Sequence, residues 1–234
     1  MIRILDVSKQ YDRETLVLQQ IELHMKTGVM GLLGFNGAGK STLLKIMAGI
    51  EEPTAGDVMI CGYSVRSEPD EVRSRIGYLP QHFEMYPHLT GREMLDYACT
   101  LKGIRSRKKR KEIVTRLLYE LNLEAKAKDK IKTYSTGMKQ RLGLAQAMIG
   151  EPPVLIIDEP TVGLDPEEKM RVRKLLAAYG REHTVVLSTH ILSDVENCCT
   201  HAAVLDEGKI RWFGIPDCKS EYREILMEGH HRHA

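Results

Sequence analysis

The sequence predicts an α/β fold with a mostly parallel sheet. Residues 154–158 and 184–188 are continuous apolar runs, which is typical of parallel strands that are buried on both faces. Between these runs, apolar side chains recur at helical spacing from Met170 to Tyr179. A strand, a helix and a second strand in this order form the unit from which parallel sheets are built.

The first part of the chain is expected to supply further strands. Residues 2–7 form an apolar-rich segment, and residues 16–25 carry a mostly alternating pattern of apolar side chains. A third apolar run, residues 29–33, leads into a glycine-rich turn and then into a segment with helical character that ends at Gly49. We therefore expect strands at 2–7, 16–25 and 29–33, followed by a helix that begins near Lys40.

The glycine-rich turn matches the phosphate-binding pattern G-x-x-x-x-G-K-[ST] at Gly34, Gly39, Lys40 and Ser41. Glycines allow the tight turn and the close approach of backbone N–H groups to a polyphosphate, and the following helix directs its positive end at the same anion. Lys40 supplies a cation for the outer phosphates, and the Ser41 hydroxyl suits Mg²⁺. The alternative is a glycine-rich turn that binds no ligand.

Two short strands and a helical segment follow. Residues 58–60 and 76–81 are expected to be strands, and from 90 to 150 the apolar side chains recur at helical spacing. The basic run at 105–111 lies in this segment. Such a run could contact nucleic acid or anionic lipid, but a solvated helix start is the favoured interpretation because the overall charge is close to zero.

The end of the chain is expected to form a hairpin and a tail. Residues 204–213 have the pattern of a β-hairpin that turns at Glu207-Gly208. Residues 229–234 contain several histidines and are expected to be disordered, with metal binding as the alternative.

Composition excludes several classes of protein. The chain has 234 residues, of which 42% are hydrophobic, and 34 Lys and Arg against 32 Asp and Glu give a net charge of +2. This balance argues against a duplex nucleic-acid binder that acts through bulk charge. No run of about 18 apolar residues occurs, so no membrane span is expected. The first residues lack the apolar core of a signal peptide, and the five cysteines suit a reducing cytosol.

Polar residues stand at the ends of the predicted strands. Asp158 ends one apolar run and Glu159 follows it, while His190 and Gln81 follow two other strands. In α/β sheets, ligands bind at this end of the strands. Asp158 and the amide oxygen of Gln81 suit Mg²⁺, Glu159 could deprotonate an attacking water, and His190 could contact a terminal phosphate. The alternatives are surface carboxylates and a structural histidine.

Taken in order, these motifs resemble the nucleotide-binding subunit of an ABC transporter along nearly the whole chain. A variant of that family's signature is present at Tyr134-Ser135-Thr136-Gly137-Met138. The stretch Gly163-Leu164-Asp165-Pro166 resembles the family's dimer-contact loop, and His190 resembles its switch histidine. Tyr11 stands where the family stacks an aromatic ring on adenine; an exposed turn tyrosine is the alternative.

The resemblance implies a P-loop NTPase core with a mostly parallel sheet, an antiparallel β subdomain and an all-helical signature subdomain. Residues 1–234 would be one ATP-binding domain, with the core and β subdomain at about 1–89 and 151–215, the helical subdomain at about 90–150 and a tail at 216–234. The implied ATP-binding residues are Tyr11, Gly34, Phe35, Asn36, Gly37, Ala38, Gly39, Lys40, Ser41, Thr42 and Gln81.

The resemblance also implies which residues act in catalysis, which bind the metal and which contact the partner copy. Lys40, Glu159 and His190 would be catalytic, with Glu159 as the general base. Mg²⁺ would be held by Ser41, Gln81 and, through water, Asp158. The signature residues act on the ATP of a partner copy, and the dimer loop contributes Asp165. The signature residues are Ser135, Thr136, Gly137 and Met138.

The signature departs from the commoner Leu-Ser-Gly-Gly-Gln form, because Thr136 replaces the first glycine and Met138 replaces the glutamine. Losing the glutamine puts in doubt any contact that it would make, whereas Ser135 and Gly137 are kept. Ser135 is also a suitable N-cap for the helix that follows. The Tyr-Ser-Thr-Gly-Met form resembles exporters of the ABC-2 type with a separately encoded permease, such as drug and antibiotic efflux systems.

The implied partners are a second nucleotide-binding domain, either an identical chain or a paralogue, and a transmembrane permease, with no nucleic acid. This would place the chain at the cytoplasmic face of the membrane. The alternative is a non-transport ATPase of the same superfamily that acts on the ribosome or on nucleic acid. Such translation factors usually carry two motif sets, and DNA-repair ATPases carry a long coiled coil, of which this sequence shows neither. A kinase or GTPase would not explain the signature or His190.

Overall fold

A computed structural model of the chain describes residues 1–12, 15–216 and 222–225. Within this part, the larger sheet has the strand order β10-β9-β3-β8-β7-β6, and all its neighbouring strands except β9 and β10 are parallel. The expected mostly parallel α/β sheet is therefore confirmed. Its strands are β3 (Gly28–Leu33), β6 (Ile76–Leu79), β7 (Val154–Asp158), β8 (Thr184–Thr189), β9 (His201–Asp206) and β10 (Lys209–Gly214).

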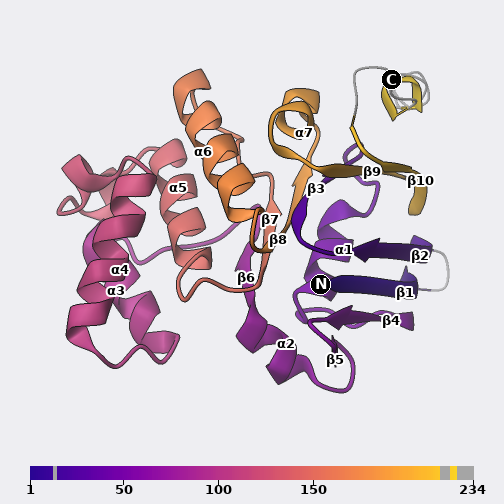
Figure 1. Ribbon diagram of the computed structural model, residues 1–234, viewed down its shortest axis with the longest axis horizontal. Coiled ribbons are helices and arrows are strands. Elements are labelled where there is room, and N and C mark those ends of the chain that lie inside the picture. Colours follow the sequence, from indigo (N-terminus) through magenta and orange to yellow (C-terminus); the bar gives the residue numbers. More distant parts are fainter. Residues whose placement is uncertain (13–14, 217–221, 226–234) are drawn as a thin grey trace.

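Strands β7 and β8 are buried along their whole length, as their continuous apolar sequences predict. Helices α6 (Pro166–Tyr179) and α7 (Leu192–Cys198) lie together on one side of this sheet (Figure 1). The approach of α7 to β3 requires a glycine, because a Cβ at Gly31 would lie 2.6 Å from a methyl group of Val195. Helix α6 was expected from its periodicity, whereas the short helix α7 was not.

A second, antiparallel sheet has the order β2-β1-β4-β5. Its strands are β1 (Ile2–Gln10), β2 (Leu16–Met25), β4 (Ala55–Ile60) and β5 (Tyr63–Ser64). Helix α1 (Lys40–Met47) shares one apolar core with β1, β2 and β4 on one side and with strands of the larger sheet on the other. The helix that carries the phosphate loop is therefore fixed between the two sheets.

Residues 90–150 contain three α-helices and two short 3₁₀ turns, as the helical spacing predicts. The helices are α3 (Gly91–Leu101), α4 (Arg107–Glu120) and α5 (Thr136–Ala147), and the turns are Glu124–Lys126 and Ile131–Thr133. Each helix is capped by a hydroxyl side chain, that of Thr90, Ser106 or Ser135, which accepts a backbone N–H of the first helical turn. These bonds satisfy donors that the first turn leaves free.

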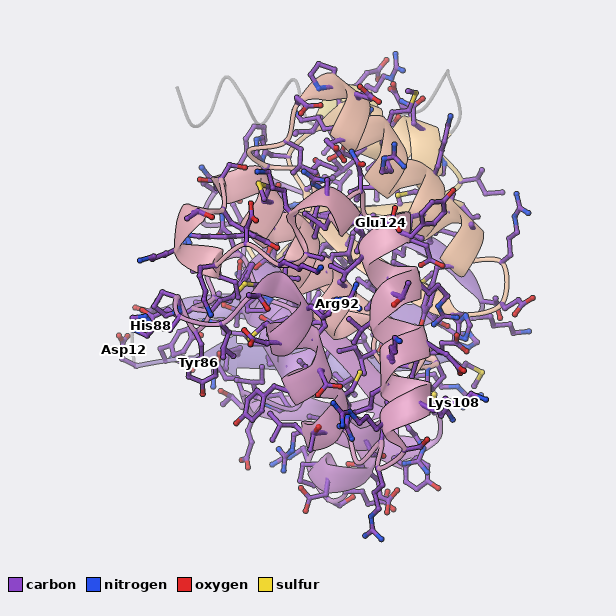
Figure 2. All side chains as sticks on the ribbon, turned by 90° about the vertical axis from the view of Figure 1, so that its left-hand side faces the viewer. Asp12, Tyr86, His88, Arg92, Lys108 and Glu124 are labelled. Carbon is purple, nitrogen blue, oxygen red and sulfur yellow. The ribbon has the colours of Figure 1, made fainter. Side chains whose placement is uncertain are left out.

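This helical segment lies at the opposite end of the molecule from the antiparallel sheet (Figure 1). Figure 2 looks onto it and shows Tyr86 and His88 at one edge and Lys108 of α4 toward the other. The basic run is largely exposed, apart from Arg110, which pairs with Asp96 at 2.8 Å. The solvated helix start is thus the arrangement observed for residues 105–111.

The sequence did not predict α2 (Pro69–Arg75), which precedes β6. The histidine-containing stretch 229–234 lies outside the described residues. Among the residues that are described, none of the helices is both long and apolar enough to cross a bilayer. The described residues include four cysteines that form no disulfide bond, namely Cys61, Cys99, Cys198 and Cys199.

Candidate functional site

The phosphate-binding pattern forms a loop between β3 and α1. Gly37 and Gly39 have φ values of 84° and 103°, which favour glycine, and Gly39 is the N-cap of α1. At Gly34, a Cβ would lie 2.3 Å from the carbonyl oxygen of Leu205 on β9. A side chain at either Gly34 or Gly39 would force the loop away from its present path, so these two glycines are structural requirements of the loop.

Lys40 is almost completely buried beneath this loop. Its Nζ donates hydrogen bonds to the carbonyl oxygens of Gly34 at 2.7 Å and Phe35 at 3.0 Å. Burial lowers the pKa of Lys40 from its ordinary value, and the carboxylates of Glu159 and Asp158 act in the opposite direction. A buried ammonium group in contact with the loop carbonyls offers a polyphosphate a cation that is already desolvated.

The loop opens onto a pocket of about 530 Å³. Most of the residues that the sequence assigns to nucleotide and metal binding line it, and Val17 is an additional member that sequence reasoning missed. Its lining consists of Tyr11, Val17, Phe35, Asn36, Gly37, Gly39, Lys40, Ser41, Thr42, Gln81, Asp158 and Glu159. Residues from four separate stretches of the chain therefore meet at one site. Gly34 and Ala38 shape the loop without lining the pocket.

Tyr11 stands at the rim of this pocket. Its side chain is 53% exposed, and its Oη lies 3.5 Å from Oγ1 of Thr42. The ammonium group of Lys9 lies 5.0 Å from the ring centroid. An exposed aromatic face beside a phosphate loop suits stacking on a nucleotide base.

Asp158 and Glu159 are placed by the parallel pairing of β7 with β8, in which Asp158 lies opposite Ser188. The Ser188 hydroxyl donates a hydrogen bond to Oδ1 of Asp158, and it accepts one from the backbone N–H of Glu159 at 3.2 Å. Ser188 thus fixes both acidic residues at the end of the strand. The sequence analysis missed this role, although a serine at the end of a buried apolar strand is a signal that a polar partner is near.

Glu159 and His190 meet at the ends of neighbouring strands. Nδ1 of His190 lies 2.9 Å from Oε1 of Glu159, and the histidine side chain is 55% exposed. The other oxygen, Oε2 of Glu159, is buried and has no partner among the described residues. A buried carboxylate oxygen without a hydrogen-bond partner destabilises the folded state. This atom is therefore a candidate to accept a proton or a hydrogen bond from a bound ligand.

The buried carboxylate of Asp194 forms hydrogen bonds with three of the segments around it. Asp194 of α7 accepts hydrogen bonds from the hydroxyl of Thr161 at 2.5 Å and from that of Thr189 at 3.0 Å. Nε of Arg173 on α6 donates to its second oxygen at 2.8 Å. The loop after Glu159 and the end of β8 before His190 are therefore held by one side chain that the sequence analysis did not single out.

The signature residues lie apart from this pocket. Ser135 caps α5, as expected, by accepting the backbone N–H of Met138 at 3.2 Å. Gly137 lies close to the loop after Glu159, because a Cβ there would lie 3.1 Å from the carbonyl oxygen of Gly163. Asp165 in turn caps α6 by accepting the N–H of Glu168 at 3.0 Å. None of the four signature residues or Asp165 lines the pocket at the phosphate loop of the same chain.

A second hollow, a groove of about 810 Å³, lies between the loop that follows β6 and the helical segment. Gln81 lines both the groove and the nucleotide pocket. Phe83 and Met85 also line the groove, but they are half-buried and pack against the main apolar core. These two side chains therefore pack at the joint between two parts of the molecule and also present a surface to the groove.

The donor atoms in the pocket fit a magnesium nucleotide. Ser41, Gln81 and Asp158 offer a hydroxyl, an amide and a carboxylate oxygen, which are the ligand types that Mg²⁺ takes alongside phosphate oxygens. The loop amides, the helix N-terminus and the buried ammonium of Lys40 suit the phosphates. Together, the fold and this site define a phosphate-loop nucleoside triphosphatase.

Comparison with known proteins identifies the family. Residues 18–162 match the family model described as ABC transporter. The Nod factor export ATP-binding protein I of Burkholderia pseudomallei (strain 1710b) is 40% identical over 215 residues, which cover 90% of this chain and 69% of that protein. The phospholipid-transporting ATPase ABCA3 of Mus musculus is 40% identical over 219 residues, covering 90% of this chain but only 13% of that protein.

Solved structures give the same result. An ATP-binding subunit of an ABC transporter is similar with a TM-score of 0.87 at 30% identity, covering 98% of this chain and 99% of that one. A dimeric ATP-binding cassette in a post-hydrolysis state, bound to ADP and Pi, is similar with a TM-score of 0.85 at 28% identity, covering 92% and 98% respectively. The chain therefore belongs to the ABC transporter family and has the ATPase domain that characterises it.

Proposed function

We propose that this chain is the ATP-hydrolysing subunit of a membrane exporter and that it works by ATP-driven dimerisation. The observation that carries the proposal is the meeting of Glu159 and His190 beside the phosphate-loop pocket. A carboxylate and an imidazole at the γ-phosphate end of such a pocket are suited to hydrolysis, in which an attacking water must lose a proton.

The residues in and beside the pocket divide the steps of this reaction among them. Lys40 and the loop amides bind the phosphate charge, and Tyr11 stacks on the adenine ring. Ser41, Gln81 and, through water, Asp158 would hold Mg²⁺, which would supply positive charge against the charge that develops on the phosphates. Glu159 accepts the proton of the attacking water, and the exposed ring of His190 senses the terminal phosphate.

The position of the signature supports a composite site. Ser135 and Gly137 do not line the phosphate-loop pocket of their own chain. They lie at the start of α5, where a helix N-terminus suits an anion. In the proposed dimer, they contact the γ-phosphate of the ATP bound by the second copy, and Asp165 lies at the contact between the copies. The second copy is an identical chain or a paralogue.

The groove between the loop after β6 and the helical segment is the proposed contact with a membrane permease. It is lined by apolar groups of Phe83 and Met85 and it adjoins Gln81, a residue of the nucleotide pocket. A permease segment in this groove would anchor the chain to the cytoplasmic face of the membrane. The exporter assignment is supported by the similarity to a Nod factor export protein and by the form of the signature.

Dimerisation of a hydrolysis-deficient variant tests this proposal. Glu159→Gln keeps the size of the side chain but removes the base, so the variant should bind Mg-ATP, turn over very slowly and elute as a dimer in size-exclusion chromatography with ATP. The same variant should elute as a monomer without nucleotide. A variant that stays monomeric with ATP and hydrolyses it at the wild-type rate would refute both the base and the mechanism.

A second substitution tests the contribution of the signature separately from that of the phosphate-loop pocket. Adding Ser135→Arg to Glu159→Gln should abolish the ATP-held dimer, because the bulky side chain occupies the surface that would face the partner's phosphate. Nucleotide binding should remain, since Ser135 does not line the pocket of its own chain. Persistence of the dimer in the double variant would show that α5 is not part of the interface.

A further inference from the structure

Gln140 connects the signature helix to the proposed general base within one chain. It lies on α5, one turn after Thr136, and its side chain is only 9% exposed. Its Nε2 donates a hydrogen bond to the backbone carbonyl oxygen of Glu159 at 3.1 Å, in buried surroundings. Gln140 is not one of the signature residues, and it has no role in the reaction described above.

The backbone of Glu159 needs such support. Its φ is 54°, in the left-handed region that few non-glycine residues occupy. Conformations of this kind persist only where the surroundings hold them. Strand β8 fixes the N–H of Glu159 through the carbonyl oxygen and the hydroxyl of Ser188, both at 3.2 Å. The C=O of Glu159 accepts the side-chain bond from Gln140 at 3.1 Å and a longer backbone bond from Val162 at 3.4 Å.

The two contacts together determine where the carboxylate points. The N–H and the C=O of a residue flank its Cα, so holding both sets the direction of the Cα–Cβ bond. For Glu159, that direction brings Oε1 to His190 and leaves Oε2 buried and unpaired. Without the bond from Gln140, the C=O of Glu159 would keep only the longer bond from the backbone N–H of Val162 at 3.4 Å. The peptide after Glu159 could then shift toward a commoner conformation, and the carboxylate would move with it.

We propose that Gln140 is a positioning residue for ATP hydrolysis, which acts by holding the carbonyl of Glu159 and hence the direction of its carboxylate. This inference rests on the proposed role of Glu159 as the base. It concerns the rate of the chemical step and not nucleotide affinity, because Gln140 does not line the nucleotide pocket.

Gln140→Met tests the proposal, because it keeps the length of the side chain and removes the donor. The turnover number for ATP should fall about tenfold, as expected for the loss of one buried hydrogen bond that matters in the transition state. The dissociation constant for ATP should stay within about twofold of the wild-type value. The matched control is Gln146→Met, the same substitution at an exposed position of the same helix, which should leave both quantities unchanged.

A double variant distinguishes positioning from a general structural effect. In the Glu159→Gln background, the carboxylate that Gln140 orients is already gone, so adding Gln140→Met should leave the residual rate unchanged. A residue that merely stabilises the fold would lower the rate by the same factor in both backgrounds. Thermal unfolding of all variants, together with Gln140→Leu as a second substitution without a donor, checks that any loss does not come from unfolding.

The outcomes separate this inference from the function on which it rests. If the wild-type chain hydrolyses ATP and folded Gln140→Met and Gln140→Leu turn over at the wild-type rate, the positioning role is overturned and the proposed function stands. An equal loss of rate in the wild-type and Glu159→Gln backgrounds also overturns it. If the wild-type chain hydrolyses no ATP, the proposed function is refuted, and the positioning role of Gln140 is refuted with it.

Discussion

Nδ1 of His190 lies 2.9 Å from Oε1 of Glu159, although 31 positions separate the two residues in the chain. Parallel pairing of β7 with β8 places the ends of these strands side by side, and both residues follow directly after the strands. The ring of His190 is largely exposed while the carboxylate of Glu159 is buried. The histidine therefore engages one of the two carboxylate oxygens of Glu159, the proposed base.

Removing this imidazole should slow hydrolysis more than it weakens binding. We expect His190→Ala to lower the turnover number about 100-fold, because the carboxylate loses the partner that orients it beside the terminal phosphate. The dissociation constant for ATP should change by about threefold or less. Phosphate release and equilibrium nucleotide binding measure the two effects, with His24→Ala, an exposed histidine on β2, as the control. Equal losses of binding and turnover would instead indicate a damaged pocket.

Lys40→Ala should weaken both binding and turnover. The variant loses the buried ammonium that contacts the loop carbonyls of Gly34 and Phe35 and that would neutralise the outer phosphates. A charge-assisted hydrogen bond of about 1.5–3 kcal/mol corresponds to a loss of affinity of about tenfold to 100-fold. Lys45→Ala, at an exposed position of the same helix, should bind ATP normally. Wild-type turnover in Lys40→Ala would refute the assignment of the phosphate site.

Tyr11→Ala should raise the KM for ATP about tenfold with little change in kcat. Stacking on the base contributes equally in the ground state and in the transition state, so its loss appears in KM alone. Tyr11→Phe keeps the ring and loses only the hydroxyl that lies 3.5 Å from Thr42, so this variant should retain most of the affinity. Steady-state kinetics of both variants decide the matter. An unchanged nucleotide affinity in Tyr11→Ala would leave Tyr11 as a turn residue at the rim of the pocket.

A charge in the groove should separate the chain from its membrane partner. Met85→Glu replaces an apolar side chain of the proposed permease contact by a carboxylate, so the fraction of the chain that is recovered with membranes should fall by about tenfold. Phe83 is a poorer position for this test, because its ring packs against the site of Gly143 and a charge there would disturb the core.

The control for this experiment is Met170→Glu, which changes an exposed methionine on α6 away from the groove and should leave membrane recovery unchanged. Thermal unfolding of Met85→Glu shows whether the protein remains folded. Full recovery of folded Met85→Glu with membranes would mean that the permease contact lies elsewhere.

The sequence by itself determined the elements whose patterns are local. The continuous apolar runs at β7 and β8 predicted buried parallel strands, and the glycine pattern between Gly34 and Ser41 predicted the phosphate loop, because both depend on residues that are neighbours in the chain. The helical spacing at 90–150 and the cap at Ser135 were predictable for the same reason. The short helices α2 and α7 were not predicted, because a segment of seven residues is too short to show a clear helical periodicity of apolar side chains.

Only the tertiary structure decided how these elements act on one another. The strand ends predicted that Asp158, Glu159 and His190 would share one edge of the sheet, but the pairing of His190 with Oε1 of Glu159 follows from the register of β7 against β8. The bond from Gln140 to the carbonyl of Glu159 likewise depends on how α5 packs beside the strand end. A sequence pattern shows which residues share a face, whereas contacts between distant segments arise from register and side-chain packing, which no local pattern records.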